Sequence, residues 1–338
     1  MFKKDKNQGI MKYRKLGNTG MEVSEVSLGT WQVGGGWGSD FEKNQAYKII
    51  NEAIDQGVNF IDTADVYDAG LSEKAVGKVL KERSESVFVA TKCGRQIQPH
   101  TNEGYTPQVL RNFVEASLLN LGIESLDLIQ LHCPPTLVYE RPEIFGLFDD
   151  LKSEGKIKHL GVSVEKVSEA IKAMEYSNVA TIQVIFNMFR LKPAEELFDL
   201  ALQNNCGIIA RVPLASGLLS GKITAETKFQ PEDHRTFNRN GEAFDKGETF
   251  SGVSLSKGLE AVEELKGLLG AKGNLAALAI KWVLMFDAVS TVIPGASKVD
   301  QVRSNTSASL LPDFTSKEME EITAIYNKYF RSEIHGQW

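Results

Sequence analysis

The stretch Leu126–His132, which reads LDLIQLH, is an apolar run of strand length that ends on a histidine. A segment with helical periodicity precedes it, opening at Thr106-Pro107 with a good N-cap and a first-turn proline and closing at Leu121-Gly122. Strands that are apolar on both faces and alternate with helices are typical of a parallel sheet covered by helices. The stretch therefore predicts an α/β fold.

The same alternation continues along the chain from Glu25 onward, with longer segments of helical period such as 42–56 between the apolar runs. Eight such strands predict a (β/α)8 barrel, the TIM barrel. An open doubly wound sheet is disfavoured, because the glycines of Gly29–Gly36 do not match the Gly-x-Gly-x-x-Gly turn and no helix follows at once. The predicted strands are Glu25–Thr30, Val58–Ala64, Val87–Lys92, Leu126–His132, His159–Val164, Thr181–Asn187, Gly207–Val212 and Thr291–Pro294.

Two segments lie outside the eightfold pattern. Residues 12–23 contain a hairpin signal around Gly17–Gly20, and we expect this hairpin to plug the barrel floor. The polar segment Gly221–Gly258 follows the seventh strand and therefore overhangs the mouth, where barrel chemistry occurs. It is interpreted as a mobile lid or cofactor clasp, with a solvated insertion as the alternative.

Composition narrows the class of protein. The chain has 338 residues, 42% hydrophobic and 24% charged, and we expect one domain over 1–338 with a flexible stretch at 1–11. A net charge of −6 argues against a nucleic-acid partner but does not exclude an anionic cofactor. Three scattered cysteines predict core residues in a reducing compartment rather than disulfides or a metal site. With no secretory signal and no membrane-length apolar run, we expect a cytoplasmic protein.

Four polar residues lie at the downstream ends of three consecutive predicted strands. Asp62, Lys92 and His132 end these strands, and Tyr67 follows Asp62 in the next loop. Because successive side chains of a strand point to opposite faces, all three strand-end residues point into the barrel near its top. Singly, each has a structural explanation, such as a core ion pair or a packed ring. Together, at the end of a barrel that carries active sites, they favour catalysis.

The chemistry of this tetrad fits proton delivery to a carbonyl. A free tyrosine has a pKa of about 10, and an adjacent lysine ammonium is expected to lower the pKa of Tyr67. Asp62 would keep Lys92 charged, and His132 would donate a hydrogen bond to the substrate carbonyl. General acid catalysis contributes about 10²–10⁴-fold, and no side chain donates hydride. The tetrad therefore requires a hydride-donating cofactor.

The chain resembles the aldo-keto reductase family over nearly its whole length. The resemblance rests on Phe60–Tyr67, on Thr91-Lys92, on the stretch 131–134, which reads LHCP, and on 117–128, which reads SLLNLGIESLDL. It implies a reductase of aldehydes and ketones, or the reverse reaction on sugars and polyols, with Tyr67 as the acid. It also implies NADPH/NADP⁺ as the cofactor and no metal.

The resemblance further implies which residues contact the cofactor. Ser163 and Gln183 would hold the nicotinamide carboxamide, although Val164 stands where many members have asparagine. Arg211 takes the place of a tyrosine under the nicotinamide ring, on which a planar guanidinium can stack. The full set is Gly29, Thr30, Trp31, Ser163, Gln183, Arg211, Pro213, Leu214, Lys222, Gly295, Ser297, Lys298, Gln301 and Asn305.

The residues expected to contact the phosphate groups of the cofactor determine the choice between NADPH and NADH. Lys222 would lie on the pyrophosphate side, whereas a loop and helix N-terminus after the eighth strand form a place where barrels often bind phosphate. Lys298, supported by Ser297, would meet a 2′-phosphate, and Gln301 and Asn305 would address the adenine. This predicts NADPH over NADH.

Two other functions remain open. One is a cofactor-binding sensor or regulatory subunit with little turnover, which the intact tetrad disfavours. The other is a lyase with a Schiff base on Lys92, which the adjacent Asp62 and Tyr67 disfavour. Specificity for a small-molecule carbonyl, sugar or polyol would come from Trp31, Gly221–Gly258 and the tail 331–338, in which Trp338 either reaches over the mouth or is disordered.

Overall fold

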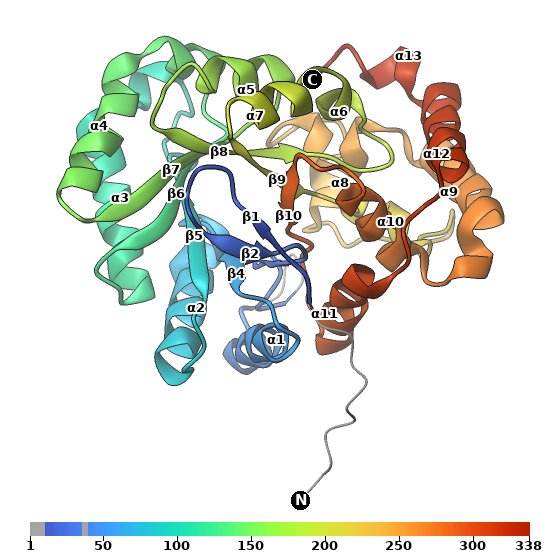
Figure 1. Cartoon of the computed structure of the whole chain (residues 1–338), viewed down its shortest axis with the longest axis horizontal. Coiled ribbons are helices and arrows are strands. Elements are labelled where there is room, and N and C mark those ends of the chain that lie inside the picture. The colour runs from blue at the N-terminus through green and yellow to red at the C-terminus, as the bar shows by residue number, and fades with distance from the viewer. Residues whose placement is uncertain (1–10, 36–39) are drawn as a thin grey trace, which may run out of the picture.

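Eight parallel strands form one sheet in the computed structural model, which describes residues 11–35 and 40–338. Each strand pairs with the next one in chain order (Figure 1). Bridges from Val26 to Val292 and from Gly29 to Gly295 join the first strand to the last, so the sheet closes into the predicted barrel. The strands are β3 Leu28–Gly29, β4 Phe60–Asp62, β5 Phe88–Cys93, β6 Leu126–His132, β7 Ile157–Ser163, β8 Val179–Ile185, β9 Gly207–Arg211 and β10 Val289–Val292.

Helices cover the outside of the sheet (Figure 1). The α-helices are α1 Lys43–Asp55, α2 Leu71–Glu82, α3 Pro107–Leu121, α4 Pro142–Ser153, α5 Val167–Ala173, α6 Lys192–Glu196, α7 Phe198–Gln203, α8 His234–Phe237, α9 Leu255–Leu269, α10 Leu275–Leu284, α11 Val299–Thr306, α12 Ser316–Tyr329 and α13 Arg331–Ile334. Short 3₁₀ segments are η1 Tyr67–Gly70, η2 Asn102–Gly104, η3 Thr136–Glu140, η4 Ala215–Ser220, η5 Lys246–Glu248, η6 Phe250–Gly252, η7 Gly270–Lys272 and η8 Ser307–Leu310. The predicted ends of α3 are confirmed, since the Thr106 side chain accepts from the Val109 N–H and Gly122 adopts a left-handed φ of 65°.

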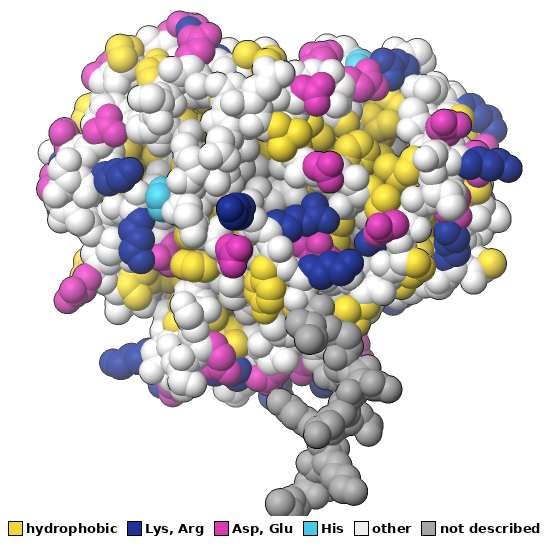
Figure 2. Space-filling model, viewed as in Figure 1, with side chains coloured by type: hydrophobic (Ala, Val, Ile, Leu, Met, Phe, Trp, Pro, Cys, Tyr) yellow, Lys and Arg dark blue, Asp and Glu magenta, His cyan; other side chains and the backbone are white. Residues whose placement is uncertain are grey.

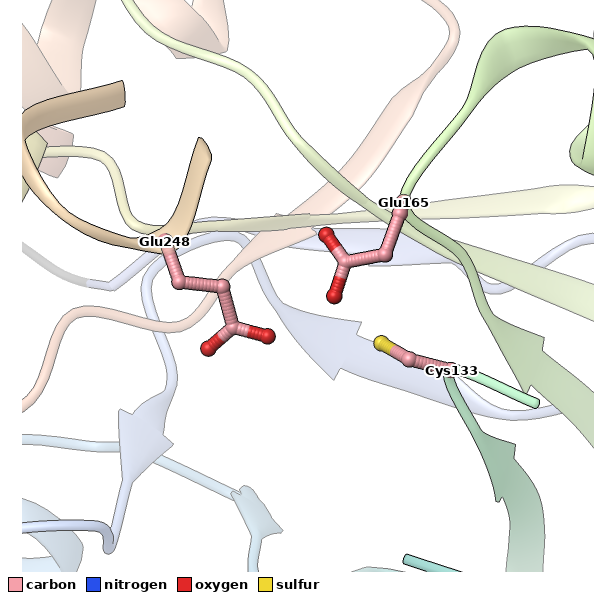
Figure 3. Close-up of side chains that lie close together, drawn as sticks. All are labelled: Cys133, Glu165 and Glu248. Carbon is pink, nitrogen blue, oxygen red and sulfur yellow. The ribbon is translucent and has the colours of Figure 1, made fainter. Parts of the chain in front are cut away.

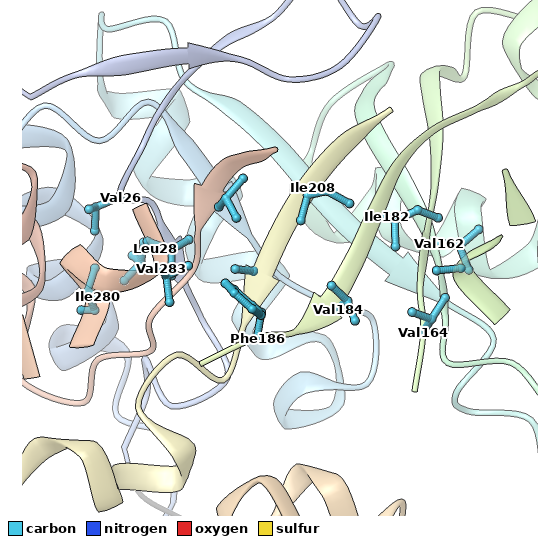
Figure 4. Close-up of a cluster of buried hydrophobic side chains, with 14 of the residues drawn as sticks. Val26, Leu28, Val162, Val164, Ile182, Val184, Phe186, Ile208, Ile280 and Val283 are labelled. Atoms are coloured by element: carbon cyan, nitrogen blue, oxygen red, sulfur yellow. The ribbon is translucent and has the colours of Figure 1, made fainter. Parts of the chain in front are cut away.

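The main core lies between the strands and the helices. Val162 on β7 and Ile182 on β8 point outward, as do their neighbours two residues on, and they join a cluster that includes Ile280 and Val283 of α10 (Figure 4). The alternate residues of the same strands, such as Ser163 and Gln183, point to the other side of the sheet. Strand parity thus separates an apolar outer layer from a polar inner one.

The predicted hairpin closes the barrel floor. It consists of β1 Tyr13–Lys15 and β2 Glu22–Ser24, paired antiparallel. Its apolar side chains join a second cluster with inward residues of the sheet, namely Leu16, Met21, Val23, Phe60, Ala90, Leu128, Ile209 and Ile293. Gly17 has a φ of 51°, and a Cβ there would collide with the backbone of Gly207 at the start of β9. Only glycine permits this close approach of the hairpin to the strand.

The predicted long loop after β9 is present, and it contains short elements that the sequence did not reveal. Within Gly221–Gly258 lie α8, η5 and η6, and α9 already begins at Leu255. Its polar composition concealed these elements, since each is too short to show helical periodicity. Buried side-chain hydrogen bonds hold it to the barrel, including Asn187 Nδ2 to Ser251 Oγ at 2.7 Å.

The tail packs against this loop. Trp338 is buried, and its indole N–H donates to Asp245 Oδ1 at 2.8 Å. The Arg190 guanidinium lies 4.1 Å from the centre of the indole ring. Of the two alternatives for Trp338, the structure therefore excludes disorder. The predicted flexible stretch 1–11 lies outside the described residues except for Met11, whose side chain is buried.

The surface carries both signs of charge, interspersed on the face shown in Figure 2. Within the described part of the chain, no helix is both long and apolar enough to cross a membrane. Cys93, Cys133 and Cys206 are free and buried, which confirms the prediction that they are core residues.

Candidate active site

Lys92 lies at the centre of the polar cluster inside the barrel mouth. Its side chain is 1% exposed, and its ammonium donates to Asp62 Oδ1 at 2.5 Å and to the Thr63 carbonyl at 2.9 Å. A third contact reaches the Tyr67 hydroxyl at 3.2 Å. The three donors of the ammonium therefore have three acceptors, one of which is the expected acid.

Two glutamines complete the hydrogen bonding of Asp62. Its second oxygen accepts from Gln183 Nε2 at 2.8 Å and from Gln130 Nε2 at 3.0 Å. The buried carboxylate is thus satisfied on both oxygens, as a buried charge requires. Gln130 was not among the predicted site residues, although it shares an inward strand face with His132, and this parity was the available signal.

Burial and neighbouring charges determine the protonation states of Lys92 and Tyr67. Desolvation alone would lower the pKa of Lys92, but Asp62 and Tyr67 raise it above its ordinary value, so the lysine stays charged. Burial raises the pKa of Tyr67, and Lys92 only partly opposes this increase. The expectation that the pKa of Tyr67 is lowered is therefore wrong for the protein alone, because desolvation outweighs the ammonium.

His132 and Trp31 flank the Tyr67 ring. The His132 ring meets it edge-on at 6.0 Å between centroids, and the Trp31 ring stacks at 6.3 Å. Burial, together with the positive charges of Lys92 and two arginines, lowers the pKa of His132 well below its usual value. The imidazole is therefore neutral and presents a single N–H donor.

Trp31 also links the site to the long loop. Its ring lies 5.1 Å from that of His234 on α8. The Trp31 ring thus contacts both Tyr67 and the loop after β9, and its contribution to substrate specificity stays a prediction. The loop thus borders the mouth beside the tetrad.

A cluster of charged residues borders the mouth, and we call Arg95, Glu165, Arg211 and Glu248 the charged ring. Arg211 Nη2 donates to Glu165 Oε2 at 3.0 Å, and its Nη1 lies 3.5 Å from Glu248 Oε1. Arg95 Nη1 lies 3.5 Å from Glu248 Oε1 and 3.7 Å from Glu165 Oε1. Carboxylates therefore hold the guanidinium of Arg211, and its stacking on a nicotinamide ring stays a prediction.

Two glutamates of the charged ring lie close to Cys133 in an arrangement that resembles a metal site, but arginine side chains already pair with both carboxylates. The donor atoms of Cys133, Glu165 and Glu248 lie within 4.8 Å of one another (Figure 3). Both carboxylates already pair with guanidinium groups, and burial raises the pKa of the Cys133 thiol. Because a thiol ligates a metal as thiolate, this arrangement disfavours a cation.

The predicted nicotinamide-side residues lie around the mouth with their own contacts. Gly29 bridges to Gly295, and a Cβ on Gly29 would stand 2.9 Å from the Ile293 carbonyl, so barrel closure alone requires glycine there. Thr30 is fully buried, and its hydroxyl donates to the Asp62 carbonyl at 3.1 Å. Ser163 lies 3.5 Å from the sulfur of Cys133. Their cofactor contacts stay predictions, as does that of Gln183, whose amide nitrogen bonds to Asp62.

The residues predicted to contact the phosphate end of the cofactor lie at two loops. After β9, Pro213 is buried and Leu214 is partly buried, while Lys222 is exposed. After β10, the Gln301 side-chain oxygen accepts from the Ser297 N–H at 2.7 Å and the Lys298 N–H at 3.2 Å, which caps α11. Asn305 donates to the Gly295 carbonyl at 3.3 Å, and Lys298 is exposed at the helix start. Gln301 and Asn305 thus have structural contacts, and their contacts with adenine stay predictions.

A further buried carboxylate, Asp65, lies behind the tetrad and gives a test of the electrostatics. Burial and the nearby Glu73 carboxylate raise the pKa of Asp65 to about 7. Ionisation of Asp65 therefore costs more in the folded than in the unfolded state, so the group destabilises the fold progressively as the pH rises from about 4 to about 7, whereas below about pH 4 it is protonated in both states. Asp65→Asn is expected to be about 1–3 kcal/mol more stable than wild type at pH 8, with the difference shrinking toward pH 4.

Urea unfolding of Asp65→Asn and wild type at several pH values measures this difference. Asp149→Asn, an exposed carboxylate on α4, serves as the control. A variant that is no more stable than wild type at pH 8 would contradict the buried, raised-pKa state of Asp65.

Comparison with known proteins agrees with this geometry. The model of the Aldo/keto reductase family matches residues 25–327. The chain is 30% identical to the uncharacterized oxidoreductase YqkF of Bacillus subtilis (strain 168) over 315 residues, 92% of this chain and 95% of that protein. It is also 30% identical to the NADH-specific methylglyoxal reductase of Escherichia coli (strain K12) over 321 residues, 88% of this chain and 93% of that protein.

A solved structure is similar over the same span. It is the glycerol dehydrogenase AKR11B4 from Gluconobacter oxydans, with a TM-score of 0.75, 29% identity and coverage of 94% of this chain and 96% of that one. The family match spans almost the whole barrel, including every strand that carries a tetrad residue. The chain therefore belongs to the aldo/keto reductase family, and its chemistry is carbonyl and alcohol oxidoreduction with a nicotinamide cofactor.

Proposed function

We propose that the chain is an NADPH-dependent reductase of aldehydes and ketones in which Tyr67 donates the proton. The observation that carries this proposal is the Lys92 ammonium, held between Asp62 at 2.5 Å and the Tyr67 hydroxyl at 3.2 Å. The neutral imidazole of His132 would donate its N–H to the carbonyl oxygen and fix its angle. In the reverse direction the same groups would take the proton from an alcohol.

The roles within the tetrad follow from charge. When bound, the cofactor supplies the hydride, which no side chain can donate. As Tyr67 gives up its proton, Lys92 stabilises the phenolate, which matters because burial otherwise raises the pKa of Tyr67. Asp62 holds the ammonium in place. Burial of the three free cysteines supports a reducing compartment such as the cytoplasm.

The residues at the loops after β9 and β10 fit a cofactor with phosphate groups. Lys298 stands exposed where α11 begins, next to backbone N–H groups at the positive end of a helix. Among the described residues, no carboxylate pairs with its ammonium. Lys222 is likewise exposed after η4. An NADH-specific relative leaves the choice between NADPH and NADH to experiment.

Lys298→Ala is expected to lower NADPH affinity about 10-fold or more and to leave NADH affinity nearly unchanged. The reason is that a charge-assisted hydrogen bond to the 2′-phosphate, which only NADPH carries, is worth about 1.5–3 kcal/mol. Dissociation constants for both cofactors, from quenching of tryptophan fluorescence, measure the effect. Lys222→Ala is the control, since a pyrophosphate contact would weaken both cofactors alike. An unchanged affinity ratio in Lys298→Ala would show that this lysine does not read the 2′-phosphate.

The alternative of a cofactor-binding sensor with little turnover is not favoured. Its distinguishing sign would be tight cofactor retention with negligible carbonyl reduction. A Schiff-base lyase is also disfavoured, because the three donors of Lys92 are occupied and its raised pKa keeps it protonated. Only a neutral amine attacks a carbonyl. Borohydride trapping on Lys92 without NADPH consumption would reverse this preference.

A further inference from the structure

Trp338 fills a socket that is formed by the loop after β9 and by Arg190, which follows β8. Its ring lies 4.1 Å from the Arg190 guanidinium, and its N–H donates to Asp245 Oδ1 at 2.8 Å. Glycines form the remaining wall, because a Cβ on Gly252 or on Gly247 would collide with the ring. We call Arg190, Asp245, Gly247 and Gly252 the indole socket, since they offer a cation over the ring face, an acceptor for the N–H and space for the ring edge.

The Arg190 guanidinium is a buried cation that the indole stabilises. The residue is 3% exposed, its Nη2 donates to the Glu165 carbonyl at 2.8 Å, and its Nη1 is buried without a hydrogen bond. Among the described residues no carboxylate forms an ion pair with it, and burial lowers its pKa to about 10. Because an aromatic face stabilises a desolvated cation, the indole compensates for the missing carboxylate. This contact therefore holds Trp338 in the socket more strongly than apolar packing alone.

The rest of the tail is held by contacts of its own. Arg331 makes two hydrogen bonds of 2.7 Å to the Glu195 carboxylate. Just before the tail, the ring of Phe330 lies 4.6 Å from that of Phe189. Neither contact involves the loop after β9. The tail therefore does not need Trp338 to stay on the barrel, and what the indole adds is a hold on the loop.

Asp245 joins the indole to η5. Its Oδ1, which accepts from the indole, also accepts from the Gly247 N–H at 2.7 Å and so caps η5. The Asp245 carbonyl accepts from the Glu248 N–H at 3.0 Å. On the other side, Ser216 Oγ donates to the Glu248 carbonyl at 3.0 Å. The segment that carries Glu248 thus has two anchors, and one of them is the indole socket.

Glu248 extends from this segment into the charged ring. Its Oε1 lies 3.5 Å from Arg95 Nη1 and 3.5 Å from Arg211 Nη1, and although burial opposes it, these arginines lower the pKa of Glu248 to about 2. The carboxyl group of Glu165 faces that of Glu248 (Figure 3). Burial raises the pKa of Glu165 to about 8, so at neutral pH it is protonated and hydrogen-bonds to Glu248. Glu248 is therefore the ionised carboxylate on which both guanidinium groups of the charged ring depend.

The charges of the ring act on the tetrad. The two arginines contribute to the lowered pKa of His132, and Glu248 contributes to the raised pKa of Tyr67. If Glu248 left the ring, two guanidinium groups without their ionised counter-charge would remain beside these groups. The placement of Glu248 thus affects both the carbonyl-orienting group and the proton donor.

We infer that Trp338 is a positioning residue for the reaction, which holds η5 through Asp245 and thereby keeps Glu248 in the charged ring. Trp338 acts on the mouth through the loop and not by covering it. The inference rests on the proposed reductase activity and adds a residue outside the mouth on which that activity depends.

The first test requires no turnover. In Trp338→Ala, trypsin cleavage after Lys246, an exposed residue of η5, is expected to be about 30-fold faster than in wild type, because the segment opens more often without the indole. Free indole at millimolar concentration is expected to slow cleavage again by refilling the socket. The analogue 1-methylindole is not, since it lacks the N–H that Asp245 accepts. Mass spectrometry identifies the cleaved bond, and circular dichroism verifies folding.

Arg331→Ala is the matched control for this test, because it loosens the tail at Glu195 and leaves the socket intact. Its cleavage after Lys246 is expected to stay close to that of wild type. Unchanged cleavage in Trp338→Ala overturns the inference, and so does faster cleavage that indole fails to reverse. If Trp338→Ala does not fold, Trp338→Phe takes its place, with an expected increase of about 10-fold from the lost N–H donor.

The second test asks whether Trp338 acts through Glu248. With propanal and either NADPH or NADH, Trp338→Ala and Glu248→Gln are each expected to lower kcat/KM about 10-fold or more, since displaced groups at a site are costly even when the change lies far from the chemistry. The double variant is expected to match Glu248→Gln alone, because a carboxylate that is absent cannot be displaced. Trp338→Phe is expected to recover part of the loss.

The outcomes separate the inference from the proposed function. Losses that multiply in the double variant, or a wild-type kcat/KM in Trp338→Ala, overturn the inference and leave the reductase proposal standing. Absence of turnover in the wild-type protein instead defeats the proposed function, and the cleavage test then decides whether the indole socket holds η5.

Discussion

Tyr67→Phe is expected to lower kcat/KM for carbonyl reduction by about 10²–10⁴-fold, the range that general acid catalysis supplies. The phenol is the proton donor nearest to the charged lysine, with its oxygen 3.2 Å from Lys92 Nζ. Burial raises its pKa, so the hydroxyl is protonated at neutral pH and available to donate. The phenylalanine ring would keep the contacts with Trp31 and His132 but lose the proton.

NADPH absorbance with a panel of carbonyls and polyols measures this loss, in both reaction directions. Tyr176→Phe is the control, because it also removes a tyrosine hydroxyl, one that donates to the Tyr139 carbonyl at 2.9 Å, far along the chain from the tetrad. Cofactor affinity in Tyr67→Phe should change little, which separates a catalytic loss from a binding loss. Near wild-type turnover in this variant would rule out Tyr67 as the donor.

Lys92→Met is expected to abolish measurable turnover and to lower the free energy of unfolding by about 3–5 kcal/mol, the cost of leaving a buried charge without its partner. Asp62 is 2% exposed and would retain only the hydrogen bonds from Gln130 and Gln183. Tyr67 would lose the ammonium that stabilises its phenolate. Denaturant unfolding and NADPH absorbance measure the two effects.

The double variant Asp62→Asn/Lys92→Met distinguishes the two roles of the pair. Replacing both charges by neutral groups is expected to restore a large part of the lost stability, because no unpaired charge remains buried. Activity should stay absent, since the ammonium is still missing. If Lys92→Met alone is as stable as wild type, Asp62 is not the buried ionised partner that its contacts indicate.

Much of the fold was predictable because period and parity are local properties of a sequence. All eight barrel strands and the floor hairpin were identified, and β6 spans the predicted Leu126–His132. Strand alternation alone also placed Asp62, Lys92 and His132 on one inward face. The long loop after β9 was predicted, but its short helices were not, because elements as short as α8 and η5 leave no periodic signal.

The charged ring is the part of the site that could not be predicted from the sequence. Arg95 and Glu165 lie beyond the ends of β5 and β7, where strand parity no longer applies, and Glu248 sits in a loop with no pattern. Arg211 was assigned by resemblance to the nicotinamide, and only its contacts with Glu165 and Glu248 revealed another environment. Pairing between residues so far apart in the chain depends on how loops pack, which no local pattern encodes.

The sequence by itself determined the barrel, the order of its strands and the identity of the four tetrad residues, because hydrophobic period fixes elements and strand parity fixes faces. Only the tertiary structure decided which groups actually meet. In the folded protein two glutamines donate hydrogen bonds to Asp62, and the charged ring lies beside His132. Burial there raises the pKa of Tyr67 more than the charge of Lys92 lowers it. These outcomes depend on distance and desolvation, which exist only once the chain has folded.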